Sequence, residues 1–83
     1  MASNWLCYML QCSDGTLYCG ITNDIEKRLN AHNEGLGAKY TRARRPVTLA
    51  FLECCEDRSS ASKREMEIKK LTRTEKLALI SSI

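Results

Sequence analysis

Apolar residues near the start of the sequence fall into two short runs that a tight turn separates. The runs are WLCYMLQC at 5–12 and TLYCGIT at 16–22, with Ser13-Asp14-Gly15 between them. Two strand-length apolar runs on either side of such a turn are typical of a β-hairpin. The pattern therefore predicts two antiparallel strands within residues 5–22.

The length of the turn decides which face of the hairpin carries the tyrosines. A three-residue loop with Gly15 in the left-handed conformation pairs Tyr8 with Gly20. It also places Tyr8 and Tyr18 on one face, because positions of equal parity point the same way. A two-residue loop at Asp14-Gly15 shifts the register by one and places them on opposite faces. We prefer the three-residue loop.

A helix is expected directly after the hairpin. Asn23-x-x-Glu26 has the spacing of a capping box, and the apolar positions that follow have helical periodicity. Arg28 and His32 are four residues apart, so both project from the same flank of this helix. Gly20 leaves room for a close approach to the strand before it. Two tyrosines, an arginine and a histidine thus form a candidate site.

The next stretch predicts a loop and a third strand. Gly35 suits a left-handed helix cap, and residues 35–46 have no apolar periodicity, so we expect a long loop there. The run VTLAFLECC at 47–55 is almost continuously apolar. Such a run predicts a central strand that is covered on both faces and adds to the hairpin.

Two more helices complete the expected fold. Asp57 or Ser59 caps the first of them, and Thr72-x-x-Glu75 is a capping box that begins the last. The order is ββα–loop–βαα, and no linker divides residues 1–83, so we expect a single domain. The predicted fold is α+β: a small three-stranded mixed sheet, made of the hairpin plus one strand, flanked by three helices.

Glu65 is the one acidic side chain expected to face inward. It lies on the edge of the apolar stripe of its helix, where a carboxylate needs a cation, backbone donors or a metal as partner. Lys69 follows four residues later, so a surface ion pair between the two is the alternative interpretation.

Composition excludes several classes of protein. With 83 residues, 43% hydrophobic and 28% charged, the chain is typical of a small globular protein. No apolar stretch approaches a bilayer-spanning length and no secretory signal is visible, so we expect a cytoplasmic protein with no membrane partner. The five cysteines have no Cys-x-x-Cys spacing and are expected to be structural thiols.

Positive charge is concentrated in one segment. The net charge is +3, and four cations with no acid among them fall within 39–45, namely Lys39, Arg42, Arg44 and Arg45. Tyr40 lies among them, and an aromatic ring between cations can stack on a nucleobase. The segment either contacts nucleic-acid phosphates or is a solvated loop.

The candidate residues suit phosphodiester cleavage better than other chemistries. There is one histidine and one inward carboxylate, so neither a Ser-His-Asp triad nor a pair of catalytic acids is indicated. Arg28 has the fork geometry for a phosphate, and Glu65 could anchor one Mg²⁺. Tyr18 or His32 could hold or deprotonate the attacking water.

Two short motifs resemble those of a known family. Leu6-Cys7-Tyr8 and Tyr18-Cys19-Gly20 resemble the paired motifs of the GIY-YIG nuclease superfamily, most closely its short stand-alone bacterial members and the nuclease domain of structure-specific endonucleases. Leu6-Cys7 replaces the Gly-Ile of the first motif. Ile21 stands where some members carry a proton-transferring lysine, so the resemblance does not identify the base.

The resemblance implies a set of roles. Tyr8 and Tyr18 match the two tyrosines, one of which helps to activate water, and Gly20 matches the closing glycine. Arg28 matches the arginine that stabilises the transition state, and His32 a position occupied by His or Tyr. Glu65 matches the ligand of a single Mg²⁺ or Mn²⁺ ion.

The expected function is a metal-dependent DNA endonuclease. The resemblance implies DNA as the partner, structure-selective cleavage and a link to DNA repair or recombination, with a partner protein or a homodimer for targeting. Two alternatives stay open at this point: a non-catalytic nucleic-acid-binding module, and an interaction domain recruited by a larger protein.

Overall fold

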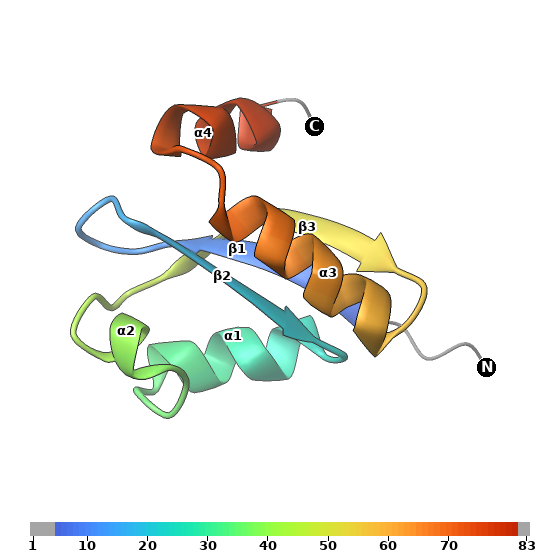
Figure 1. Ribbon diagram of the computed structural model, residues 1–83. Coiled ribbons are helices and arrows are strands. Elements are labelled where there is room, and N and C mark those ends of the chain that lie inside the picture. The colour runs from blue at the N-terminus through green and yellow to red at the C-terminus, as the bar shows by residue number, and fades with distance from the viewer. Residues whose placement is uncertain (1–4, 82–83) are drawn as a thin grey trace.

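A central strand organises the protein. The computed structural model describes residues 5–81, and its three strands are β1 (Trp5–Gln11), β2 (Leu17–Thr22) and β3 (Thr48–Cys55). They form one sheet in the order β2-β1-β3 (Figure 1). The α+β class and the three strands are as predicted, but the sheet is antiparallel throughout rather than mixed. The reason is that β1 lies in the middle and both neighbours run against it.

The hairpin has the register that a three-residue turn predicts. The Cys12 N–H donates to the Thr16 carbonyl over 2.8 Å, and Gly15 has a φ of +85°, in the left-handed region. Tyr8 therefore lies opposite Gly20. Tyr8 and Tyr18 share one face of the sheet, as expected.

β3 is an edge strand, so the prediction that 47–55 is the central strand is wrong. Its residues pair with β1 alone, and a bulge shifts the register between Met9 and Leu10. Leu49 and Leu52, on the face that carries Tyr8, remain 40% and 39% exposed. A continuous apolar run identifies a strand but does not tell whether a second strand or a helix covers it.

Four helices accompany the sheet within residues 5–81, one more than predicted. They are α1 (Ile25–Asn33), α2 (Lys39–Arg42), α3 (Arg58–Lys69) and α4 (Arg73–Ser81). In Figure 1, α3 crosses in front of the sheet, whereas α1 and α2 lie together below it. The additional helix α2 is a single turn within the stretch expected to be a loop. None of these helices is long and apolar enough to cross a membrane.

Alternate residues of β1 pack on opposite sides. Cys7 and Met9 pack with Phe51 and with Ile68 of α3, and residues of α4 close this cluster. On the other side, Tyr8 and Leu10 pack against the apolar residues of α1. Cys7, Cys12 and Cys19 are buried free thiols, as the structural interpretation of the cysteines predicts.

The helix caps agree with the sequence at three of four positions. Asp57 begins α3 by accepting from the Ser60 N–H, and the Thr72–Glu75 capping box precedes α4. Gly35 is left-handed after α1, with a φ of +80°.

The cap of α1 differs from the prediction. Asp24, not Asn23, caps the helix, and its carboxylate accepts from the Lys27 N–H over 3.1 Å. Both side chains are able to cap a helix, and the Thr22 hydroxyl, which contacts Asp24 twice, favours the later start.

Candidate active site

A pocket at the edge of β2 brings together the predicted tyrosines, arginine and glutamate. Its volume is about 310 Å³, and it is lined by residues of β1, β2, α1, α3 and the segment before α2: Tyr8, Tyr18, Gly20, Ile21, Arg28, Gly37, Ala38 and Glu65. Because β2 is an edge strand, side chains from α1 on one face and α3 on the other reach around it. Residues separated by more than fifty positions thereby share one cavity.

Gly20 allows Tyr8 to reach this cavity. Tyr8 belongs to the central strand and is only 2% exposed. Its phenol lies across Gly20 of β2, where an added Cβ would be 2.6 Å from the phenol oxygen. A side chain at position 20 would therefore displace the phenol, which gives a physical reason for the glycine of the second motif.

His32 does not line the pocket. It is 1% exposed, and its Nε2 lies 3.1 Å from the Tyr8 Oη. Its Nδ1 lies 2.7 Å from the Thr41 Oγ1. Both ring nitrogens are thus occupied, and His32 contacts residues that line the pocket through its hydrogen bond to Tyr8 and its ring contact with Tyr18. The prediction that Tyr18 or His32 could hold or deprotonate a water stays a prediction, and both nitrogens of His32 are already hydrogen-bonded to protein.

Burial and charge define the resting protonation of this pair. Burial raises the pKa of Tyr8 above its ordinary value, and the neighbouring Tyr18 raises it further. Burial lowers the pKa of His32 below its ordinary 6.5, and the positive charge of Arg28 lowers it further. At neutral pH the site therefore holds a neutral phenol and a neutral imidazole.

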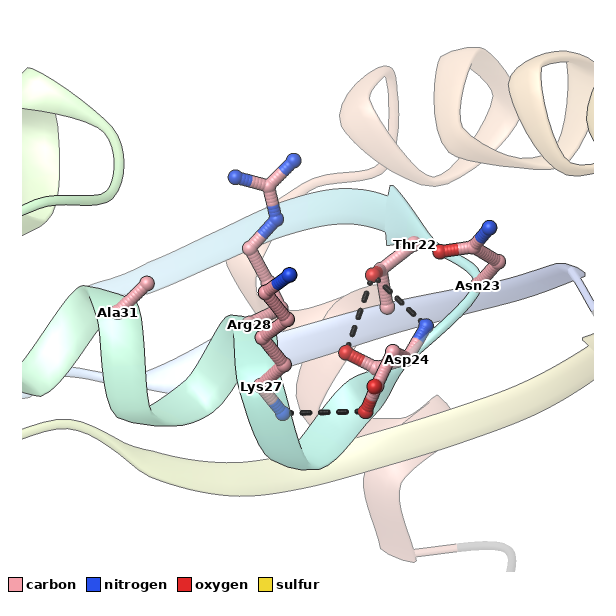
Figure 2. Close-up of a pocket in the computed structure, with 6 residues that line it drawn as sticks. All are labelled: Thr22, Asn23, Asp24, Lys27, Arg28 and Ala31. Atoms are coloured by element: carbon pink, nitrogen blue, oxygen red, sulfur yellow. Dashed lines mark hydrogen bonds between the residues drawn. The ribbon is translucent and has the colours of Figure 1, made fainter.

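The guanidinium of Arg28 has no hydrogen-bonding partner within the described residues. Within residues 5–81 this group makes no hydrogen bond and no ion pair, and Figure 2 shows it extending from α1 past the edge of β2. It also lines a neighbouring cavity of about 250 Å³, together with Thr22 to Asp24, Lys27 and Ala31. A guanidinium without a protein partner between two cavities is available for an anion.

Glu65 lies in the pocket and also pairs with Lys69. The Lys69 Nζ is 3.3 Å from the Glu65 Oε2, and the two side chains are 55% and 21% exposed. The expected pocket carboxylate and the alternative surface pair are therefore both present. An ion pair this open to water contributes little free energy, about 0–1 kcal/mol, so it does not commit Glu65 to Lys69.

The donor set of the pocket fits a hard divalent cation held by one carboxylate. Within the described chain no three His, Cys, Asp or Glu side chains gather into a cluster. Mg²⁺ commonly uses one or two carboxylates and completes its shell with waters and substrate phosphates. Glu65 is suited to that role, with Tyr8 and Tyr18 oxygens on the same cavity wall.

The basic segment divides into two pairs of side chains. Arg44 binds Asp14 of the hairpin turn over 3.1 Å and lies 4.1 Å from the Tyr40 ring centre. Arg45 donates to the Arg42 carbonyl over 2.8 Å. Lys39 and Arg42 are exposed, and in the part of the chain described here their side chains have no partner.

The aromatic residue of this segment joins the site. The Tyr40 ring lies 5.8 Å from the Tyr18 ring, which itself lies 5.2 Å from the ring of His32. These ring contacts connect Tyr40 of the exposed segment, through Tyr18, to the buried His32.

Sequence reasoning missed Thr41 and Gly37. Thr41 is completely buried against His32, yet a threonine in a polar stretch has no distinguishing pattern. Gly37 carried a usable signal, because a second glycine so soon after Gly35 indicates close packing. A Cβ at position 37 would collide with the His32 ring.

Known proteins are similar to this chain over most of its length. A model of the GIY-YIG catalytic domain matches residues 4–78. The UPF0213 protein DP2720 of Desulfotalea psychrophila is 53% identical over 79 residues, which cover 94% of this chain and 72% of that protein. The UPF0213 protein CPE1444 of Clostridium perfringens is 57% identical over 75 residues, covering 90% and 81%.

Two solution NMR structures extend the similarity to the fold. The UPF0213 protein BH0048 of Bacillus halodurans is 40% identical with a TM-score of 0.61, covering 94% of this chain and 83% of that one. The protein EF2693 of E. faecalis is 44% identical with a TM-score of 0.62, covering 94% and 84%. The expected resemblance is confirmed, and the chain belongs to the GIY-YIG catalytic-domain family, among its UPF0213 members.

Proposed function

We propose that this protein is a metal-dependent endonuclease that hydrolyses phosphodiester bonds of DNA. A GIY-YIG catalytic domain implies a nuclease-type activity. The observation that carries the finer proposal is the shared cavity of Tyr8, Tyr18, Arg28 and Glu65, with His32 directly behind Tyr8. It combines a cation for phosphate, a carboxylate for a metal and phenols for a water.

Arg28 would bind the scissile phosphate. Its guanidinium is free of protein partners in the described chain and has the planar fork that matches two phosphate oxygens. Negative charge grows on those oxygens as the nucleophile attacks. A cation bound to those oxygens therefore stabilises the transition state more than the ground state.

Glu65 would hold one Mg²⁺ or Mn²⁺ ion. When bound, such an ion polarises the phosphate and stabilises the leaving oxygen. The Lys69 ammonium that now pairs with Glu65 is half-exposed and able to move into solvent. Glu65 would exchange one cation for another without leaving the pocket.

Tyr8 or Tyr18 would orient the attacking water. Both phenols line the cavity, whereas both nitrogens of His32 are already bonded. The histidine would therefore act through the Tyr8 hydroxyl. A general base must lie within hydrogen-bond reach of the water, which favours the phenols over the imidazole.

The basic segment would contact the DNA backbone next to the cavity. Lys39 and Arg42 are exposed cations whose side chains have no partner within residues 5–81, and the Tyr40 ring lies beside that of Tyr18 at the cavity wall. Target choice would come from DNA shape, from this segment or from a partner protein. A cytoplasmic role in DNA repair or recombination is part of the same proposal, and the free thiols suit a reducing compartment.

The deciding experiment is a cleavage assay with branched, nicked and single-stranded DNA in Mg²⁺, in Mn²⁺ and in EDTA. We expect metal-dependent cleavage that Glu65→Gln lowers by at least about 100-fold, because the shape is kept and the charge is lost. Glu67→Gln on the same helix is the matched control, since Glu67 lies outside the pocket and pairs with Arg64. Salt-sensitive binding with no cleavage under any metal would instead favour a non-catalytic binding module.

A further inference from the structure

Three buried polar side chains form a line that leads inward from the pocket. Tyr8, His32 and Thr41 are 2%, 1% and 0% exposed. Hydrogen bonds of 3.1 Å and 2.7 Å connect them through the two nitrogens of His32. The line ends at the Ala38 carbonyl, 2.9 Å from the Thr41 Oγ1. Its directions depend on which nitrogen of the imidazole carries the proton.

The Ala38 carbonyl determines where the Thr41 hydroxyl proton lies. A carbonyl oxygen only accepts, and two oxygens 2.9 Å apart repel unless a proton lies between them. The hydroxyl proton therefore points to Ala38. Toward His32, the Thr41 oxygen then presents a lone pair, and Nδ1 must be the donor.

The same reasoning extends to Tyr8. A neutral imidazole with its proton on Nδ1 has an unprotonated Nε2, which is an acceptor. The Tyr8 hydroxyl therefore donates to Nε2. Its proton points into the protein, and the remaining lone pairs of its oxygen are free to face the cavity.

We propose that Thr41 is a positioning residue, whose hydroxyl holds His32 in the Nδ1–H tautomer and thereby makes the Tyr8 oxygen an acceptor on the cavity side. In the opposite tautomer Nε2–H would donate to Tyr8, and the phenol proton would point into the cavity. A phenol in that state donates to a water instead of accepting from it. The consequence for cleavage rests on the proposed function, whereas the hydrogen-bond directions do not.

The arrangement supplies a balanced proton path for the attacking water. The water gives one proton to the Tyr8 oxygen while Tyr8 passes its own proton to Nε2. The products are a hydroxide, a neutral Tyr8 and an imidazolium whose Nδ1–H still donates to Thr41. A phosphate on Arg28 would offset the positive charge that otherwise opposes the imidazolium.

The tautomer is directly measurable, because the chain has a single histidine. Long-range ¹H–¹⁵N NMR spectra of protein labelled with ¹⁵N-histidine distinguish the two tautomers without mutation or substrate. Above neutral pH we expect the Nδ1–H pattern. The Nε2–H pattern in the wild-type protein would overturn the proposal, whether or not the protein cleaves DNA.

Variants then separate positioning from packing. Thr41→Val keeps the shape but removes the hydroxyl, so we expect a mixture of tautomers and a cleavage rate about 10- to 100-fold lower. Thr41→Ser restores the hydroxyl and should recover both the Nδ1–H pattern and most of the rate. Thr22→Val is the matched control, since Thr22 is the other buried threonine of residues 5–81 and its hydroxyl is hydrogen-bonded there to the backbone of Asp24 rather than to His32.

The outcomes distinguish this inference from the proposed function. An unchanged Nδ1–H pattern in folded Thr41→Val would show that Thr41 does not hold the ring, and it would overturn the proposal. If Thr41→Val does not fold, the wild-type spectrum and Thr41→Ser still decide. A wild-type protein that cleaves nothing removes the proposed function but leaves the tautomer assignment standing.

Discussion

The two faces of β1 are equally buried at residues 7–10, but their side chains make different kinds of contact. On one face Cys7 and Met9 are 0% exposed and pack in a cluster of apolar side chains and thiols. On the other, Tyr8 is 2% exposed and its hydroxyl meets His32, while its ring borders a cavity. Burial alone therefore does not separate packing from chemistry in this protein. The two are distinguished by whether a buried side chain has a polar atom and by the partner of that atom.

On the packing face, the Cys7 thiol is chemically quiet. The Cys7 and Cys19 sulfurs are 4.0 Å apart on adjacent strands. That contact and burial raise the pKa of Cys7 well above its ordinary value. A thiol that stays protonated is a poor nucleophile, so Cys7 serves as a small apolar group.

The largest expected effect is on cleavage and comes from the Tyr8 face. Tyr8→Phe removes only the hydroxyl, and we expect the cleavage rate to fall about 10²- to 10⁴-fold, the usual range for a lost general base. Stability should fall by about 1–3 kcal/mol, because Nε2 of His32 loses its partner. Single-turnover rates and urea unfolding measure the two quantities. A large rate loss in Tyr18→Phe, with little in Tyr8→Phe, would assign the water to Tyr18 instead.

The packing face should respond in the opposite way. Met9→Ala leaves a cavity in the core, and we expect it to lower the free energy of unfolding by about 2–5 kcal/mol. Such a loss is a large part of the total for a small domain. Cleavage per folded molecule should change little. Leu36→Ala, at a position 76% exposed, is the control and should stay within about 0.5 kcal/mol of wild type. Loss of cleavage in Met9→Ala without loss of stability would break the contrast between the faces.

Local rules predicted the hairpin and much of the site, and tertiary contacts decided the rest. The turn at Gly15 determines the hairpin register and so places Tyr8 and Tyr18 on one face. The single turn of α2 is too short to have a periodic pattern and depends on contacts with His32 and the hairpin. The position of Thr41 beside His32 depends on those contacts, and no sequence motif could have identified it.

The prediction of a central strand at 47–55 was wrong for a related reason. Its composition fits a strand with two covered faces, but the cover depends on where the helices lie. The central strand β1 is covered by α3 on one face and by apolar residues of α1 on the other, whereas β3 lies at the edge of the sheet.

A smaller effect is expected on the pH dependence of stability. In the folded protein the pKa of His32 lies below 6.5, its ordinary value. As the pH falls from 6.5 toward that lowered pKa, the unfolded chain therefore binds a proton that the folded protein does not. The free energy of unfolding should therefore be highest above about pH 6.5 and decrease below it. Urea titrations from about pH 8 to about pH 5 measure this slope. His32→Gln should flatten it, and an unchanged slope would assign it to other groups.

The smallest expected effect concerns the basic segment, where the described contacts divide the cations into matched pairs. Lys39 and Arg42 are exposed and have no side-chain partner within residues 5–81. Arg44 and Arg45 hold the segment against the hairpin turn and the end of α1. Replacing either pair by Ala removes two positive charges, so each double variant controls for net charge in the other.

If Lys39 and Arg42 contact phosphates, their loss should lower the slope of log affinity against log salt by up to ~0.9 per lost contact on duplex DNA. Folding stability should stay within about 0.5 kcal/mol of wild type, because neither side chain is buried. The Arg44 and Arg45 variant should instead lose measurable stability, since it removes an ion pair, a cation–π contact and the hydrogen bonds that hold the segment. Equal salt slopes in the two variants would mean that only net charge matters. A stable Arg44 and Arg45 variant with the larger slope change would transfer the phosphate contacts to these two arginines, and the bracing seen here would then be a resting arrangement that DNA displaces.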